Sequence, residues 1–536
     1  MENLELFQQN CACHSVSRRG FLAVGCAACA AAGWMNVDGT MAAAGPIPVS
    51  PPKKGAKKIR LFFVLHSPVQ QQPDWPNVGF DFRPVMDHMT AELNAAYDDL
   101  EFLPGMVNGP EATNAILAED RELDGTSDAI AGCVVVQMNC WNHCVQACVA
   151  TGKPVLYVDF QFGGSGGFLV YTAGMLRADV KNFGFIGSSD FNDVIAAAGC
   201  FRTVENSADF GAAVASVRAY RTPMMKIEMV ADPVPLETMP IPELIEKVRG
   251  MKLLAIGAPM GGELIDPTYS ELGIEVISMN YTELNDLWEK ADTDEAAKIV
   301  RRWKDTARVI ADDVPEETLM ASAKMTIAMR QMIEKYDARG ITVNCLGGFY
   351  GLQIQAYPCL GFYELLNSGY IGACECDIRS AVTMIVMTEL TNGRPGYISD
   401  PIIDTSKRQI VYAHCVASNR EYGPDGPSNP FEILTHSEDR NGASVRSIVR
   451  CGGMTTTVEF SPDRKEILFH QAVVVENDPD DRACRTKIGA VPLGSIDKLY
   501  TQWDRYGWHR VTYFGDLKSQ VYALADALGW TICEET

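Results

Sequence analysis

The chain alternates short apolar runs with helical stretches, and this alternation limits the possible folds more than any other feature. The runs "KKIRLFFVL", "AGCVVVQM" and "GKPVLYVDF" lack a polar face, as do strands of a parallel sheet covered on both sides. Strands that alternate with helices predict a doubly wound sheet, here over residues 58–205. The segment "GGSGG" at 163–167 follows a strand without the spacing of a dinucleotide site, so we expect a flexible loop there.

Two further units are expected after the first one. Over residues 206–340, "MKLLAIGAP" and "GIEVISMNYTEL" predict strands, and a methionine-rich stripe along 315–337 predicts a buried helix. Over residues 341–536, short strands end in polar residues, and "ASVRSIVRCGG" and "MTTTVEF" indicate antiparallel β structure. The predicted class is therefore α/β, with two doubly wound Rossmann-like domains followed by a mixed α/β C-terminal domain. A chain of 536 residues has room for three such domains.

Residues 1–45 carry a targeting pattern and are left out of the predicted fold. "SRRGFLAVGCAACAAAG" places Arg18 and Arg19 before a short apolar run, and "MAAAG" offers a small-residue cleavage site. This pattern is typical of a twin-arginine export signal, and the apolar run is too short to span a bilayer comfortably. We therefore expect a periplasmic or otherwise extracytoplasmic protein that the twin-arginine export machinery carries. The alternative is a chance arginine pair before an amphipathic helix.

The charge of the chain excludes several classes of partner. Its formal net charge is -22, whereas binding to nucleic acid or to an anionic membrane surface requires basic patches. The balance suits a protein that handles a neutral or cationic small molecule.

Among the 17 cysteines, one group has a spacing that invites a second interpretation. In "CWNHCVQAC", Cys140, Cys144 and Cys148 are four residues apart and would form one stripe on a helix. Such a stripe could bind a metal or pack against the core. The spacing matches no zinc or iron–sulfur pattern, so we expect a packed helix face.

Four polar residues stand at strand ends of the third unit. Glu375 closes "IGACE", Asp400 follows "PGYIS", His414 closes "QIVYAH", and His509 lies in "GWHRVTYFGDL". Two carboxylates and two imidazoles form a donor set suited to Mn²⁺ or a similar divalent cation. Taken singly, each histidine could be a structural residue and Asp400 could cap a turn. As a set at the strand ends of an α/β protein, they indicate a ligand site.

The stretch from "GACECD" to "MTELTNGRPGYISD" resembles the metal-binding core of the L-fucose isomerase and L-arabinose isomerase superfamily. In those enzymes a strand that ends in an acid leads through a helix and a turn to a second acid. "GMKLLAIGAPMGGELID" and "ELGIEVISMNYTEL" are similar to the family's second domain. The tail around His509 resembles the family's final histidine.

The resemblance implies an aldose–ketose isomerase that forms a homo-oligomer, a trimer or a hexamer. It implies that Glu375 and Asp400 bind Mn²⁺ and exchange protons with a fucose- or arabinose-type sugar, and that His509 is a third ligand. His414 matches the arabinose-type pattern better than the fucose-type pattern. Asp377, two residues after Glu375, is expected to support the site or to cap the following helix.

The residue types suit this chemistry independently of the resemblance. Interconversion of an aldose and a ketose moves a proton between neighbouring carbons through a cis-enediol, and two carboxylates can manage the carbon and hydroxyl protons. A metal would stabilise the enediolate charge. "HSEDR" at 436–440 could line a sugar pocket or form a surface turn. The alternatives are an exported sugar-binding protein without turnover, and a metal-dependent sugar epimerase or hydrolase.

Overall fold

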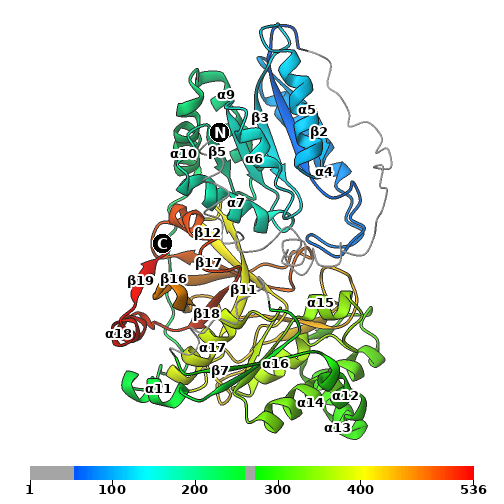
Figure 1. The fold of residues 1–536 in the computed structure, drawn as a ribbon, viewed down its shortest axis with the longest axis vertical. Coiled ribbons are helices and arrows are strands. Elements are labelled where there is room, and N and C mark those ends of the chain that lie inside the picture. The colour runs from blue at the N-terminus through cyan, green and yellow to red at the C-terminus, as the bar shows by residue number, and fades with distance from the viewer. Residues whose placement is uncertain (1–52, 260–271) are drawn as a thin grey trace.

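The protein consists of three structural units stacked along its long axis (Figure 1). The computed structural model describes residues 53–259 and 272–536, so the export signal expected at 1–45 lies outside the described residues. A parallel-sheet unit lies at one end, a barrel of antiparallel strands lies in the middle, and a second parallel-sheet unit lies at the other end. Within the described ranges, none of the helices has the length and apolar character of a membrane span.

The first unit is a five-stranded parallel sheet in the order β2-β1-β3-β4-β5. Its strands are β1 (Lys57–Val64), β2 (Leu100–Val107), β3 (Ile130–Gln137), β4 (Val155–Asp159) and β5 (Phe183–Ile186). Its helices are α4 (Arg83–Ala96), α5 (Pro110–Glu122), α6 (Cys144–Val149), α7 (Ser165–Arg177), α8 (Phe191–Ala198), α9 (Cys200–Thr203), η3 (Ser207–Asp209) and α10 (Phe210–Arg221). Successive β1 residues pack on opposite faces, since Leu61 and Phe63 contact the core under α4 and α10, whereas Phe62 and Val64 contact the core under α6 and α7. The doubly wound sheet expected from the apolar runs is confirmed.

The strand order places a ligand crevice at one position in this sheet. β1 pairs with both β2 and β3, so the connections that follow β1 and β3 run to opposite faces of the sheet. The position between β1 and β3 is therefore a switch point. In sheets of this kind, ligands bind at the carboxyl ends of the strands that flank the switch point. The prediction of a flexible loop at 163–167 is wrong, because a helix begins within this segment. Ser165 begins α7, and its hydroxyl donates to Asp159 at the end of β4, at 2.9 Å.

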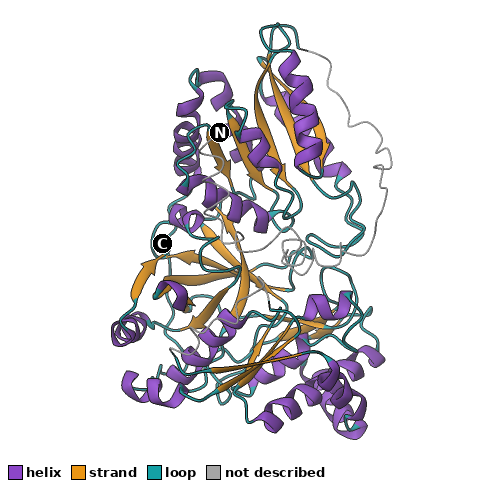
Figure 2. Ribbon diagram, in the orientation of Figure 1, coloured by secondary structure: helices purple, strands orange, loops and turns teal. Residues whose placement is uncertain are grey.

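The second unit is a four-stranded parallel sheet in the order β10-β9-β6-β7, with helices around it (Figure 2). Its strands are β6 (Lys252–Ile256), β7 (Glu275–Met279), β9 (Gly340–Val343) and β10 (Ile371–Ala373). Its helices are α11 (Ile241–Val248), α12 (Thr282–Lys290), α13 (Thr293–Thr306), α14 (Glu316–Tyr336), α15 (Cys345–Tyr350) and α16 (Cys359–Asn367). The methionine stripe of α14 is core, as expected, with Met325, Met329 and Met332 buried. The sheet draws strands from both sides of the expected domain boundary at 341.

The third unit is a closed antiparallel barrel in the order β15-β18-β11-β12-β17-β16, which closes because β16 pairs with β15. Its strands, with β19 added parallel to β16, are β11 (Tyr397–Asp404), β12 (Gln409–His414), β15 (Met454–Ser461), β16 (Glu466–Asn477), β17 (Thr486–Pro492), β18 (Arg510–Phe514) and β19 (Thr531–Glu534). A small sheet in the order β14-β13-β8 consists of β8 (Val309–Ile310), β13 (Phe431–Leu434) and β14 (Ser444–Ser447). The short helices near the barrel are η5 (Pro462–Arg464), η6 (Ile496–Thr501) and α18 (Lys518–Leu528). The predicted fold class, two Rossmann-like sheets with a C-terminal antiparallel region, is confirmed.

Helix α17 (Ile378–Leu390) joins the second sheet to the barrel. All of its residues are buried, because it packs against the second sheet on one side and against β15 and β18 on the other. Asp377 caps its N-terminus by accepting a hydrogen bond from the Ser380 amide at 3.0 Å. This helix therefore fixes the segment that links β10 to the barrel.

Candidate metal centre

Four side chains converge at the junction of the second sheet and the barrel. Glu375 follows β10, Asp400 lies in β11, His414 ends β12 and His509 immediately precedes β18. Each offers a ligand atom, these atoms lie within 4.8 Å of one another, and all four residues are buried. The structure thus brings together all four residues that the sequence singled out as candidate metal ligands.

The distances within this cluster suit a central cation. His509 Nε2 lies 3.4 Å from Asp400 Oδ1 and 3.8 Å from Glu375 Oε2. His414 Nε2 lies 3.8 Å from both Glu375 Oε1 and Asp400 Oδ2. A cation held at about 2.1 Å by each donor would separate neighbouring donors by roughly 3–4 Å. The spacing and the mixed oxygen and nitrogen donors could therefore hold a divalent metal ion.

Three buried atoms of the cluster make no hydrogen bond to any residue that the structure describes. They are Asp400 Oδ1, His414 Nε2 and His509 Nε2, and all three belong to ligand candidates. Buried polar atoms are nearly always hydrogen-bonded, because leaving one unsatisfied costs about 1–3 kcal/mol. A cation among these atoms would satisfy them together, so the residues present fit a metal.

The backbone at Glu375 adopts an uncommon conformation. Glu375 and Cys376 have φ values of 60° and 52°, in the left-handed region that residues with a side chain rarely adopt. Such a conformation costs roughly 1–2 kcal/mol per residue. The Cys376 amide donates to the Val343 carbonyl at 2.9 Å, which secures the turn against β9. Strain of this kind is concentrated at functional sites, and here it directs Glu375 toward the barrel.

His509 is oriented by a carboxylate behind it. Its Nδ1 donates to Asp377 Oδ2 at 2.9 Å, and the Ser380 hydroxyl donates to the same oxygen at 2.9 Å. Burial acts to lower the pKa of His509, but Asp400 and Asp377 raise it well above its usual value, so the ring is protonated on both nitrogens. A cation would replace the proton on Nε2 while Nδ1–H stays bonded to Asp377, which is the arrangement of metal-ligating histidines. The expected helix cap at Asp377 is confirmed, and the same carboxylate contacts His509.

His414 has a different environment. Its Nδ1 accepts a hydrogen bond from the Cys415 amide at 3.0 Å, so the neutral ring carries its proton on Nε2, facing Glu375 and Asp400. Burial lowers the pKa of His414 to about 4, which keeps the ring neutral. Binding a cation through Nε2 would require displacing this proton. His509, whose Nδ1 keeps its proton when a cation replaces the one on Nε2, is therefore the better prepared of the two histidine ligands.

The two carboxyl groups are driven toward different protonation states. Burial raises the pKa of Glu375 well above its usual value, and the Asp400 carboxylate adds to this effect while His509 opposes it. Burial also acts to raise the pKa of Asp400, but its contact with His509 outweighs burial and the pKa is lowered. Paired carboxyls with pKa values moved in opposite directions are typical of acid–base sites.

A cavity opens beside Glu375 and Asp400. Its wall combines all three units, with further residues Asp74, Trp75, Cys140, Trp141, Gly166, Leu346, Pro401, Glu438 and Trp508. The first four of these follow β1 and β3, the strands that flank the switch point of the first sheet. Trp141 and Trp508 lie with ring centroids 4.7 Å apart. Aromatic side chains with a few converging polar groups are the typical lining of a small-molecule site.

Several wall residues were missed by reasoning from the sequence. Trp141 lies within the cysteine motif and Trp508 directly precedes His509, but a single indole has no sequence spacing that marks it as part of a pocket wall. Glu438 belongs to "HSEDR", for which a pocket wall and a surface turn were both open, and it lines the cavity. Asp74 and Trp75 carried no recognisable signal, because the loop after β1 is positioned by contacts with distant segments.

The expected cysteine stripe does not form as one face. Helix α6 begins at Cys144, so Cys140 precedes the helix and lines the cavity instead. Cys144 and Cys148 pack in the core, as expected for a buried helix face. Within residues 53–259 and 272–536, the group with metal-binding spacing is the cluster of Glu375, Asp400 and the two histidines.

Comparison with known proteins indicates sugar isomerases. No family model matches the chain. Proteins named sulfoquinovose isomerase from Priestia megaterium and a Clostridium species are 24% identical over 224 residues and 25% identical over 305 residues, respectively. A sulfoquinovose isomerase from Alkalicoccus urumqiensis is 27% identical over 103 residues. The chain is thus distantly similar to sugar isomerases.

These matches cover only part of each protein. The match to the Priestia protein covers 41% of this chain and 49% of that protein. The match to the Clostridium protein covers 53% of this chain and 65% of that protein, and the match to the Alkalicoccus protein covers 19% of this chain and 23% of that protein. Among solved structures, a methylene-tetrahydromethanopterin dehydrogenase and an ABC transporter solute-binding protein from Burkholderia multivorans match with TM-scores of 0.18 and 0.16. The dehydrogenase is 12% identical, and the match covers 70% of this chain and 96% of the dehydrogenase chain. The solute-binding protein is 11% identical, and the match covers 63% of this chain and 95% of the binding-protein chain. With such low TM-scores, neither match is evidence for the fold of this protein.

Proposed function

We propose that this protein is a metal-dependent intramolecular oxidoreductase that interconverts an aldose and a ketose. The observation that supports it most is the convergence of Glu375, Asp400, His414 and His509 beside a cavity lined by tryptophans. The distant similarity to sulfoquinovose isomerases favours the same class of reaction. Both observations agree with the resemblance to fucose and arabinose isomerases in the sequence.

The proposed metal is Mn²⁺, because two carboxylates and two imidazoles suit a transition metal better than Ca²⁺. Glu375, Asp400 and His509 would hold it, with His414 as a fourth ligand. When bound, such an ion acidifies the substrate and stabilises the negative charge of an enediolate.

Glu375 and Asp400 divide the proton transfers. Glu375 is the more basic of the two, because burial raises its pKa, and it is the proposed acceptor of the proton from carbon. Asp400, with its lowered pKa, is the proposed carrier of the hydroxyl proton. Asp377 holds the His509 ring in place. The tryptophans reduce the access of water to the substrate carbons.

The finer points of the proposal come from the sequence. The substrate is a fucose- or arabinose-type sugar, and the enzyme is a homo-oligomer, a trimer or a hexamer. It is exported by the twin-arginine pathway to the periplasm or another extracytoplasmic space. Its domains span 58–205, 206–340 and 341–536, with the metal centre in the last one.

The test is incubation of Mn²⁺-loaded protein with a panel of hexoses, deoxyhexoses and pentoses in D₂O. Conversion of one sugar to its ketose, with deuterium at the carbon beside the carbonyl, is the expected result. Sugar binding without conversion or deuterium uptake for any member would reject the isomerase in favour of a binding protein. Epimer formation without a ketose would identify an epimerase.

A further inference from the structure

The proposed isomerisation needs a step for which the metal centre assigns no residue. In water, hexoses and pentoses are mostly closed rings, in which C1 is a hemiacetal carbon and no carbonyl group is present. The proton on the neighbouring carbon becomes acidic only after the ring has opened. Ring opening is catalysed by a base that takes the proton of the anomeric hydroxyl and an acid that gives a proton to the ring oxygen. A protein that binds the closed ring therefore requires a second pair of proton-transferring groups besides Glu375 and Asp400.

Asp74 and Glu438 are two carboxyl groups on the cavity wall that lie outside the metal cluster. Asp74 lies in the loop after β1, at the switch point of the first sheet, and Glu438 lies between β13 and β14. The Val78 amide donates to the Glu438 carbonyl at 2.7 Å, so the two loops are in contact. Both carboxyl groups thus line the cavity that Glu375 and Asp400 also line.

Asp74 is held as a hydrogen-bond acceptor. Its Oδ1 accepts from the Trp75 amide at 2.8 Å, and its Oδ2 is bonded to His66 Nε2 at 3.1 Å. The side chain of His66 is 41% exposed, so this pair connects the buried carboxylate to solvent. The Ala483 amide donates to the Pro76 carbonyl at 3.1 Å, which fixes the loop. An ionised carboxylate only accepts hydrogen bonds, so Asp74 is placed as the base of the pair.

Glu438 is held as a proton donor. The Tyr350 hydroxyl donates to its Oε2 at 2.6 Å, and its Oε1 makes no hydrogen bond to the residues that the structure describes. Burial raises the pKa of Glu438 to about 8, with the His436 ring acting against burial and the Asp74 carboxylate adding to it. Most of this carboxyl group therefore carries a proton at neutral pH, and a proton on Oε1 would face a ligand in the cavity.

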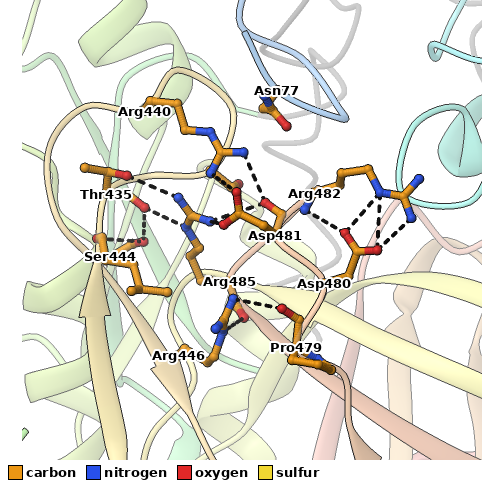
Figure 3. Close-up of polar contacts among 12 residues, drawn as sticks. Asn77, Thr435, Arg440, Ser444, Arg446, Pro479, Asp480, Asp481, Arg482 and Arg485 are labelled. Carbon is orange, nitrogen blue, oxygen red and sulfur yellow. Dashed lines mark hydrogen bonds and ion pairs between the residues drawn. The ribbon is translucent and has the colours of Figure 1, made fainter. Parts of the chain in front are cut away.

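The loop that carries Glu438 is anchored by two arginines that share one carboxylate (Figure 3). Arg485 donates to the Thr435 carbonyl at 2.7 Å and to Asp481 at 2.5 Å. Arg440 pairs with the same carboxylate at 2.8 Å. These bonds join the loop to the segment before β17, so the acid is positioned before a ligand binds.

We propose that Asp74 and Glu438 open the sugar ring before isomerisation, with Asp74 as the base and Glu438 as the acid. Asp74 takes the proton of the anomeric hydroxyl, and the electron pair of that O–H bond forms the carbonyl bond at C1. The bond between C1 and the ring oxygen breaks, its electron pair goes to the ring oxygen, and this oxygen takes the Glu438 proton. Closure of the ketose ring runs these transfers backward and returns both carboxyl groups to their starting states.

His66 is a positioning residue in this scheme, because it bonds Asp74 and does not belong to the cavity wall. The inference rests on the proposed function for the identity of the ligand as a sugar. It gives the first sheet a part in the reaction, since Asp74 is the base that this unit contributes.

The test measures the exchange of anomers, which requires ring opening and no isomerisation. Mn²⁺-loaded full-length protein is added to freshly dissolved α-D-glucose, α-D-galactose, α-L-fucose and β-L-arabinose, and NMR of the anomeric protons follows the approach to equilibrium. Buffer with the same Mn²⁺ concentration gives the spontaneous rate, which the protein should raise for at least one sugar. No acceleration with any of the four sugars would overturn the inference, whether or not a ketose forms. Faster exchange without a ketose would count against the isomerase alone.

Variants of the two carboxyl groups identify the residues responsible. Asp74→Asn and Glu438→Gln should each lower the protein-dependent exchange by about 10²-fold or more, because an amide is neither a useful base nor a useful acid. Both should keep native Mn²⁺ affinity, which shows that they are folded, since neither residue belongs to the metal cluster. Asp179→Asn, an exposed acid paired with Lys181 at 2.5 Å, is the control and should exchange anomers at the native rate. Native exchange in either carboxyl variant would overturn the assignment.

A pair of His66 variants tests the positioning role on a partly exposed side chain, where substitution should not impair folding. His66→Gln can still donate to Asp74 and should keep most of the exchange, whereas His66→Phe cannot and should lose it. Equal exchange in the two variants would contradict the positioning role.

Discussion

Replacement of Asp377 by asparagine separates two roles that one carboxylate performs. Its Oδ1 accepts the Ser380 amide at the start of α17, and its Oδ2 accepts His509 Nδ1. Asparagine caps helices as well as aspartate does, so the helix should be retained. The amide NH₂ that replaces Oδ2 is a donor, so His509 would have to accept at Nδ1 and carry its proton on Nε2. In that tautomer a cation could bind only by displacing the Nε2 proton, as at His414.

The expected size of this effect follows from the contacts. Loss of a carboxylate behind a metal-ligating histidine typically weakens metal affinity or activity 10- to 100-fold, which is about 1.4–2.7 kcal/mol. Asp377→Ala removes the cap as well, at a further cost of about 1 kcal/mol in the free energy of unfolding. For a domain of this size that corresponds to a decrease in melting temperature of about 2–4 °C.

The assay combines Mn²⁺ titration calorimetry with melting temperatures of the metal-free proteins. Asp377→Asn should lose metal affinity and keep its melting temperature, whereas Asp377→Ala should lose both. The matched control is Asp292→Ala, because Asp292 caps α13 by accepting from the Asp294 and Glu295 amides, far from the metal centre in sequence. It should lose stability and keep metal affinity. Native Mn²⁺ affinity in Asp377→Asn would refute the reasoning.

Three further predictions follow from the site and its surroundings. Mn²⁺ should support the highest activity, with Co²⁺ or Mg²⁺ weaker, and full turnover after exhaustive chelation would contradict the metal requirement. His414→Gln should reduce activity less than Asp400→Asn, as measured by kcat/KM at saturating Mn²⁺, because His414 is the less prepared ligand. Burial acts to lower the pKa of His436, but its bond to Asp439 raises it to about 9. The pair therefore contributes stability below about pH 6.5 that is lost as the pH rises toward 9, and chemical denaturation should show this slope flattened in Asp439→Asn.

The fold class and the ligand cluster could be predicted from the sequence because their signals are local. Apolar runs that alternate with helices define parallel sheets, and polar residues at strand ends indicate where ligands bind. Glu375 stands out because an acid follows an apolar strand and precedes a helix. Glu375, Asp400, His414 and His509 lie at the ends of different strands, and they could be grouped because carboxylates and imidazoles are both metal ligands.

The rest of the site depends on contacts between distant parts of the chain. Closure of the barrel requires β15 to pair with both β16 and β18, and this pairing has no local signal. Asp74 reaches the cavity because its loop is bonded to that of Glu438, hundreds of residues away in sequence. The cysteine stripe failed because periodicity does not define where a helix begins, and α6 begins after Cys140. The difference between His414 and His509 depends on the partner of each Nδ1, which composition cannot supply.

In the proposed mechanism, Glu375 transfers a proton as well as holding the metal. The most direct measurement is deuterium incorporation beside the substrate carbonyl by Glu375→Gln at saturating Mn²⁺, with metal occupancy determined in the same sample. A glutamine is neither a useful base nor a useful acid, and acid–base groups typically contribute about 10²- to 10⁴-fold. Exchange should therefore fall by at least 10²-fold at full occupancy. Near-native exchange by the metal-saturated variant would contradict the account.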